Sequence, residues 1–135
     1  MRRTIQPNLI LACAVIILAA ATGCGPKAGT ETGGHDYTVR GQVTRPPDAS
    51  GLHIYHEAID DFVGRSGKVE GMDTMLMPFP VAQGVPLEGI QANDKVEVKL
   101  HVDWASENPV EIREIRELPP GTKLEFRAAK PPKNP

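Results

Sequence analysis

The stretch KVEVKLHVDW, residues 95–104, decides the fold class of this chain. Apolar side chains occupy every second position of this stretch, and charged or polar side chains occupy the positions between them. Such alternation is typical of a β-strand with one buried face, because a strand turns successive side chains to opposite sides. The apolar positions are Val96, Val98, Leu100, Val102 and Trp104. The pattern predicts a core strand and places His101 on its outer, solvated face.

Two shorter strands are expected before this one. Residues 36–44 alternate in the same way, and the run Pro46-Pro47-Asp48 should stop that strand. Residues 51–56 (GLHIYH) predict a second strand, in which His56 shares a face with two apolar residues. Both strands are therefore expected to contribute one face to a common core.

The rest of the chain gives weaker signals. Residues 59–70 are polar and hold two glycines, so we expect a long excursion, of helical or hairpin character. Residues 72–81 (MDTMLMPFPV) predict a third strand, partly at a sheet edge because proline cannot donate to a ladder. Residues 110–118 have a helical period, although their start also suits a strand followed by a bulge. Leu124 and Phe126 are candidates for one more strand.

Four or five short strands separated by turn residues predict an all-β fold, a small antiparallel barrel. The chain has 135 residues, which leaves room for one domain. We assign residues 36–118 to this barrel. Residues 24–35 lack an apolar period and should form a flexible tether, and residues 119–135 should form an extension with a loose end.

The first 23 residues predict an export signal. Arg2 and Arg3 precede an apolar run over residues 9–21, which is too short for a membrane-spanning helix of about 20 residues. Small residues then precede Cys24, an arrangement that resembles the lipobox of bacterial lipoproteins. The resemblance implies lipidation of Cys24 and a periplasmic, membrane-anchored protein, with the outer membrane favoured by Gly25. An ordinary signal peptide cut nearby is the alternative.

Composition argues against several classes of function. The formal charge is −2, and no basic stretch lies outside the signal, so nucleic acid is not an expected partner. Cys13 lies in the signal and Cys24 would carry lipid, so the mature domain has neither a free thiol nor a disulfide. The chain also lacks a zinc-binding HExxH motif and a phosphate-binding glycine loop. We therefore expect a monomeric protein that is not an enzyme.

Three methionines cluster at Met72, Met75 and Met77. On a strand the last two share a face, and a bend could bring Met72 over them. Thioether sulfur is soft, and it suits Cu(I) and Ag(I) better than zinc, calcium or magnesium. His56, on the preceding predicted strand, is the best candidate for a nitrogen ligand. From spacing alone, the methionine pair is equally compatible with simple filling of the core.

The segments HEAI (56–59) and MDTMLMPF (72–79) are similar to the CusF-like family of periplasmic copper-binding proteins. In that family a histidine and a Met-x-Met pair bind Cu(I) or Ag(I). The resemblance implies that the metal is bound by His56, Met75 and Met77. Met72 stands where the best-known members carry a capping tryptophan, and it would be either a fourth sulfur ligand or a hydrophobic lid.

The same resemblance implies a five-stranded OB-like barrel whose last strand includes residues 112–118, despite their helical period. One departure is the insertion over residues 60–70, which lengthens the spacer between His56 and Met75. We expect a metal carrier or buffer in copper homeostasis or cuproprotein assembly, with a copper efflux or oxidase-assembly protein as partner. The alternative is a non-metal interaction module that offers a methionine-rich surface.

Overall fold

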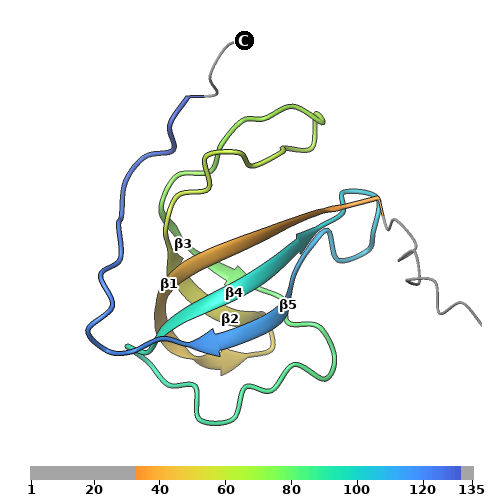
Figure 1. The fold of residues 1–135 in the computed structure, drawn as a ribbon. Coiled ribbons are helices and arrows are strands. Elements are labelled where there is room, and N and C mark those ends of the chain that lie inside the picture. The colour runs from red at the N-terminus through yellow and green to blue at the C-terminus, as the bar shows by residue number, and fades with distance from the viewer. Residues whose placement is uncertain (1–32, 132–135) are drawn as a thin grey trace, which may run out of the picture.

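The computed structural model of this chain describes residues 33–131 and is all-β, with five antiparallel strands in one sheet (Figure 1). The strands are β1 (His35–Asp48), β2 (Gly51–His56), β3 (Met75–Phe79), β4 (Lys95–Val102) and β5 (Val110–Glu117). Within the described range no helix is long and apolar enough to cross a membrane. The predicted signal peptide, Cys24 and most of the predicted tether lie outside the described residues.

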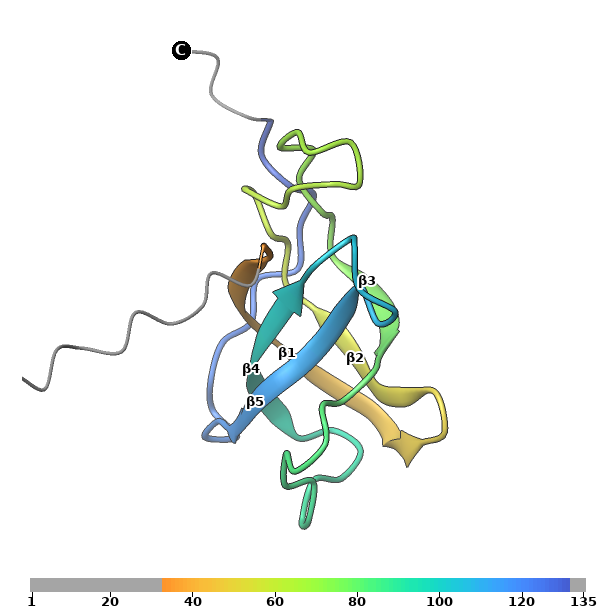
Figure 2. The ribbon, with the colours of Figure 1, turned by 90° about the vertical axis from the view of Figure 1, so that its right-hand side faces the viewer.

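The sheet closes into a small OB-like barrel (Figure 2). Its strand order is β3-β2-β1-β4-β5, so β1 joins the β2–β3 hairpin to the β4–β5 hairpin. The two outer strands meet through a parallel bridge between Val81 and Ile112. There the Ile112 N–H donates to the Pro80 carbonyl at 2.8 Å, and the Ala82 N–H donates to the Ile112 carbonyl at 2.9 Å. This parallel closure after β3 leaves the starting end of β3 free to carry a site at the barrel rim.

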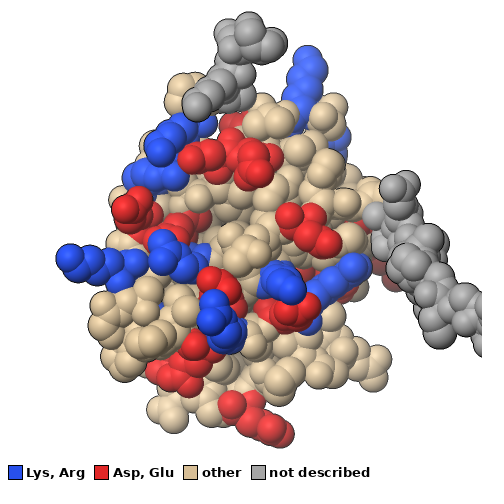
Figure 3. Space-filling model, viewed as in Figure 1, with Lys and Arg blue, Asp and Glu red and all other residues tan. Residues whose placement is uncertain are grey.

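The predicted alternation is confirmed over residues 95–102, whereas Trp104 lies in a turn after β4 and is only partly buried. All four apolar residues of β4 are almost fully buried, whereas Lys99, between them, is exposed. They meet inward-facing residues of the other strands, chiefly Val43, Leu52, Ile54, Phe79 and Ile112. On the face seen in Figure 3, acidic and basic side chains are interspersed. Cross-strand ion pairs between β4 and β5 join Lys99 to Glu114 and Arg116 to Glu97.

The first strand is longer than the sequence pattern predicted. β1 begins at His35, inside the predicted tether, because His35 pairs with Val102 of β4. It also continues through Pro46 and Pro47 and ends at Asp48, the last residue of the run that was expected to stop it. The register with β2 shifts between Arg45 and Asp48, and this irregular part of the ladder needs no N–H from either proline.

Residues 110–117 form the strand β5, which Leu118 follows, and a bulge explains their helical period. In the pairing of β4 with β5, Lys99 lies opposite Glu114 but Leu100 lies opposite Ile112. The extra residue, Arg113, shifts the alternation by one position. Ile112 and Ile115 therefore face the same side of the sheet at a spacing that a regular strand does not allow. The prediction of a bulged strand is confirmed.

The insertion between β2 and β3 is an irregular hairpin over residues 59–72. Ile59 and Met72 form a bridge in the same register as the β2–β3 ladder, and Val63 pairs with Val69 farther out. The buried ring of Phe62 holds the hairpin to the barrel between Tyr37, at a centroid distance of 5.4 Å, and Trp104, at 6.2 Å. The insertion therefore lengthens the hairpin outward and does not shift β3 along β2.

The C-terminal extension has no regular secondary structure within its described part. The strand expected at Leu124 and Phe126 is therefore absent. The backbone N–H groups of Glu125, Arg127 and Ala129 donate to side-chain oxygens instead of to a strand backbone. The segment runs along one side of the barrel, back toward the insertion hairpin (Figure 1).

Candidate metal centre

His56 is the last residue of β2 and is fully buried in the barrel wall. It lies between Gly41 of β1 and Met75 of β3, which are its partners in the two ladders. Gly41 permits this close packing. A Cβ atom at that position would lie 2.7 Å from the Tyr55 carbonyl oxygen and 2.9 Å from the His56 Cα. Glycine on β1 thus lets the end of β2 approach closely enough to bury the imidazole.

The hydrogen bonding of His56 leaves one ring nitrogen without a partner. Nδ1 lies 2.7 Å from the backbone carbonyl oxygen of Glu57, and because a carbonyl only accepts, Nδ1 carries the proton. Nε2 is then an acceptor, and it is buried with no hydrogen-bond partner among the described residues. Phe79 packs against the ring edge-on, at a centroid distance of 5.6 Å. The imidazole is therefore held in the tautomer that keeps an unused lone pair on Nε2.

The two predicted sulfur ligands lie on the β3 side of this imidazole. Met75 is directly opposite His56, and Met77 is opposite Ile54, on the diagonal from His56. Side chains of directly opposed residues share a face, with Cβ atoms about 5 Å apart, and diagonal neighbours are roughly 7–8 Å apart. Both thioethers are long enough to converge over such distances. The register thus places all three residues on one face of the β2–β3 hairpin.

The solvent exposure of the three residues increases from His56 through Met77 to Met75. His56 is inaccessible, Met77 is partly buried against the core, and Met75 is 40% exposed. An ion held among them would have the imidazole on its inner side and a solvent-accessible thioether on its outer side. Met75 begins β3, so the solvent-exposed end of this arrangement lies at the start of that strand.

Met72 lies near these residues but outside the β2–β3 ladder. It pairs with Ile59, and its side chain is partly buried against the hydrophobic core. Trp104 packs against Phe62 and under the guanidinium of Arg65, which lies 5.4 Å from the ring centroid. Met72 therefore remains the candidate for a fourth ligand or lid, and Trp104 belongs to the anchor of the insertion hairpin.

The electrostatic environment favours a neutral His56. Burial lowers the pKa of His56 because a charged ring is poorly solvated there, and the hydrogen bond to the Glu57 carbonyl opposes this only in part. At neutral pH the ring is thus uncharged, and its lone pair is available to a metal. Among the described residues, no group of three or more His, Cys, Asp or Glu side chains could hold a metal ion.

Arg40 and Glu57 are supporting residues that our sequence analysis missed. Arg40 donates to Glu57 through Nε at 2.9 Å and through Nη2 at 3.0 Å. The Glu57 N–H also donates to the Arg40 carbonyl at 2.8 Å. These bonds fix the residue whose carbonyl holds the His56 ring. The sequence signal was the register: once Gly41 faces His56, Arg40 must face Glu57.

His101 is buried, which corrects the prediction that it is solvated. Its Nδ1 lies 2.7 Å from a carboxylate oxygen of Asp36, and its exposed fraction is only 5%. Gly34 lies against the ring, since a Cβ there would be 2.6 Å from Cε1. The chain thus crosses over the end of β4 and covers an otherwise outward-facing side chain. The ladder partners of His101 are Asp36 and Glu111, so no thioether lies opposite it.

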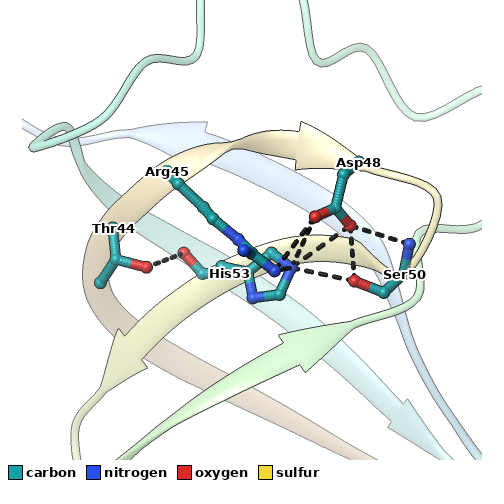
Figure 4. A network of polar contacts seen from close by, with 5 residues as sticks. All are labelled: Thr44, Arg45, Asp48, Ser50 and His53. Carbon is teal, nitrogen blue, oxygen red and sulfur yellow. Dashed lines mark hydrogen bonds and ion pairs between the residues drawn. The ribbon is translucent and has the colours of Figure 1, made fainter.

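His53 belongs to a polar network that closes the β1–β2 hairpin (Figure 4). Its Nε2 lies 2.7 Å from Arg45 Nη2 and 2.9 Å from Ser50 Oγ. Asp48 accepts from both the Ser50 hydroxyl and the Ser50 N–H, and these hydrogen bonds lower the pKa of Asp48 to about 2. Because Arg45 contacts Nε2 of His53, this histidine is engaged in the hairpin turn and is not a candidate ligand.

Comparisons with known proteins add one structural likeness. No model of a known protein family matches the chain, and no curated protein matches it. The solved structure of apo-CusF residues 6–88 from Escherichia coli is similar, with a TM-score of 0.46 and 16% sequence identity, over 69% of this chain and 99% of that chain. The assignment of an OB-like barrel rests on the strand order and the β3–β5 closure described above.

Proposed function

We propose that this chain is an exported, lipid-anchored protein that binds Cu(I) or Ag(I) through His56, Met75 and Met77. The observation that carries the proposal is the buried Nε2 of His56, which has no hydrogen-bond partner within residues 33–131 and belongs to a residue that lies opposite a methionine. A buried acceptor without a partner costs about 1–3 kcal/mol. A bound ion would satisfy that lone pair.

The donor set accounts for the choice of metal. A neutral imidazole and two neutral thioethers provide soft ligands without charge, which suit a monovalent soft ion and suit Zn²⁺, Ca²⁺ or Mg²⁺ poorly. Thioethers also persist in an oxidising compartment, where thiolates tend to form disulfides. The donors therefore fit the periplasmic location that the N-terminal sequence predicts.

Exposure of the Met75 side chain favours a carrier or buffer over a permanent metal site. Met75 can exchange its place on the ion for a ligand from another protein, because it lies at the rim. We propose handover to or from a copper efflux or oxidase-assembly protein, in copper homeostasis or cuproprotein assembly. Lipid on Cys24 would hold the barrel at the membrane beside such partners. No catalytic role is proposed.

A competition titration tests this function. The purified protein is titrated with Cu(I) against a chromophoric Cu(I) chelator, and wild type is expected to take up one ion. His56→Ala and Met75→Leu should each lose this uptake, whereas His101→Ala should keep it. His101 is the matched control because it is also buried and its Nε2 also lacks a hydrogen-bond partner in the described part of the chain. Unchanged uptake in both ligand variants would reject the assigned site.

An interaction module is the second candidate, and exposed apolar residues support it. Tyr55 and Leu76, which pair across β2 and β3, are exposed on the outer face of the hairpin, and the exposed ring of Phe126 packs on Tyr55. Such a surface could receive a partner without any metal. Met75→Leu separates the two functions, since leucine keeps the apolar surface but removes the sulfur. Partner binding that survives this substitution, in a protein that takes up no Cu(I), would favour the module.

A further inference from the structure

The C-terminal strap, residues 123–130, contacts the chain immediately next to both ends of the candidate metal site. It lies along the β2–β3 hairpin. The chain just before the strap is tied to β4, where Lys95 Nζ donates to the Pro120 and Thr122 carbonyls at 2.6 Å. The strap follows β5 in sequence, so its return to this hairpin is a tertiary contact. The strap is held against the hairpin by hydrogen bonds to a small number of specific residues.

On the β2 side, the strap binds the residue that orients the imidazole. The Glu125 N–H donates to a Glu57 carboxylate oxygen at 2.5 Å, on the carboxylate that also receives Arg40. One position along, the Phe126 ring packs on the Tyr55 ring at a centroid distance of 4.4 Å. The strap therefore contacts the residues on either side of His56.

On the β3 side, the strap binds the residues just before Met75. The Arg127 N–H donates to Thr74 Oγ1 at 2.9 Å, and the Thr74 N–H donates to the Arg127 carbonyl at 3.1 Å. The Ala129 N–H donates to an Asp73 carboxylate oxygen at 2.7 Å. Thr74 and Asp73 thus join the strap to the start of the third strand.

The base of the insertion hairpin is the third anchoring point. The Arg127 guanidinium donates to both carboxylate oxygens of Asp60, at 2.7 and 2.8 Å, and the Lys130 N–H donates to the same carboxylate at 2.7 Å. The hydrogen bonds from Arg127 are the main reason that the pKa of Asp60 falls to about 2. Asp60 thus stays ionised, and keeps its bonds to the strap, far below neutral pH.

We propose that the C-terminal strap positions the metal ligands, by fixing the Glu57 end of β2 and the Thr74 end of β3 to one another from outside the ladder. The last backbone pair of the β2–β3 ladder is His56–Met75, and beyond it the chains diverge until the Ile59–Met72 bridge. The strap spans this gap with Arg127 at its centre. This inference rests on the proposed function and assigns a positioning role to Arg127, which is hydrogen-bonded to Thr74 and Asp60.

Positioning of this kind is reciprocal. If the attached strap raises the affinity for the ion, the bound ion must stabilise the attached strap by the same factor. A segment that only adds to general stability would show no such dependence on the ligands. Reciprocity is therefore the property to measure.

The experiment uses Arg127→Ala in the full chain, with Arg116→Ala as the matched control, because Arg116 forms an exposed pair with Glu97 on β4. Ag(I), which avoids oxidation, is the probe. Arg127→Ala should weaken Ag(I) binding roughly five- to tenfold, and Arg116→Ala should leave it unchanged. In wild type, Ag(I) should slow hydrogen exchange at the Glu125, Arg127 and Ala129 amides, and His56→Ala should remove this slowing.

Each failure has a distinct meaning. Wild-type protein that takes up no Ag(I) overturns the proposed function and, with it, the positioning role. If the wild-type protein binds Ag(I) and Arg127→Ala binds it with the same affinity, the positioning role alone is overturned. The same conclusion follows if Ag(I) does not slow hydrogen exchange at the strap amides. Loss of affinity in Arg127→Ala with a correspondingly lower melting temperature would point to misfolding, and Arg127→Lys decides that case. The lysine variant should recover part of the affinity if the contact with Asp60 positions the site, and failure to recover any overturns the role.

Discussion

Arg40 contacts both carboxylate oxygens of Glu57, and Glu57 is the residue whose backbone carbonyl accepts the ring proton of His56. A charged pair on the outer side of the barrel is thus connected, through one backbone group, to the orientation of a buried imidazole. Ligating histidines commonly depend on such a bond to their second ring nitrogen. The pair therefore offers a way to disturb the site without touching a ligand.

Glu57→Ala should weaken Cu(I) binding about tenfold while leaving the stoichiometry at one. The substitution removes the carboxylate that fixes the Glu57 backbone, but it keeps the carbonyl, so His56 loses orientation and not its hydrogen-bond partner. Lys99→Ala, which breaks the exposed pair of Lys99 with Glu114, is the control. Competition titrations at one pH give the comparison, and equal losses in both variants would contradict the assigned role of Glu57.

Much of the fold could be predicted from the sequence, because the alternation in β4 follows directly from the burial of one face of the strand. The strict pattern from Val96 to Val102 needed no tertiary information, and neither did the short strand ending at His56. Residues 110–118 show the opposite case. The bulge at Arg113 gives a strand a helical spacing of apolar residues, and only the partner strand reveals it.

The site was predictable in its ligand types but not in its support. Met75 and Met77 are chemically conspicuous, and the period of two places them on one face. The support comes from Gly41, Arg40 and Arg127, which are distant in sequence and carry no local signal. The prediction that His101 is solvated was wrong for a related reason, because the burial of His101 depends on a chain segment that crosses over the end of β4.

Met72→Leu decides the role of the third methionine. The Met72 side chain packs against the core from the insertion hairpin, and leucine should preserve that packing at a cost below about 1.5 kcal/mol. We expect Met72→Leu to keep one-to-one binding with a smaller loss of affinity than Met75→Leu. Sulfur K-edge or extended X-ray absorption of the Cu(I) protein counts the sulfur neighbours directly. Three sulfurs in wild type and two in Met72→Leu would instead make Met72 a ligand.

Gly41→Ala should displace the end of β2 and damage the site and the fold together. A Cβ there would meet the Ile54 side chain and the backbone at Tyr55 and His56, and these backbone atoms cannot yield without moving the strand. Such overpacking costs about 1–3 kcal/mol. Thermal unfolding of the apo protein measures the loss. Gly121→Ala is the control, because a Cβ at that position has open space around it. A Gly41→Ala protein as stable as wild type would mean that β1 and β2 are less closely packed than described.

The pH dependence of binding should come from His56 alone. Burial lowers the pKa of this ring, so Cu(I) affinity should be constant from alkaline pH down through the ordinary histidine pKa of about 6.5. Once the pH falls below the lowered pKa, a proton competes for Nε2, and affinity should drop by about tenfold per pH unit.

The stability of the apo protein should depend on pH in a different range. Its free energy of unfolding should decrease as the pH falls from about 6.5 to the lowered pKa, because there the unfolded chain binds a proton that the folded chain does not. His56→Gln should lack both effects, since thioethers carry no proton to displace. Titrations and urea unfolding across this range compare the two proteins. His56 would not be a ligand if the Cu(I) affinity of the wild type already fell tenfold per pH unit above pH 6.5. The same would hold if His56→Gln had the same pH profile as the wild type.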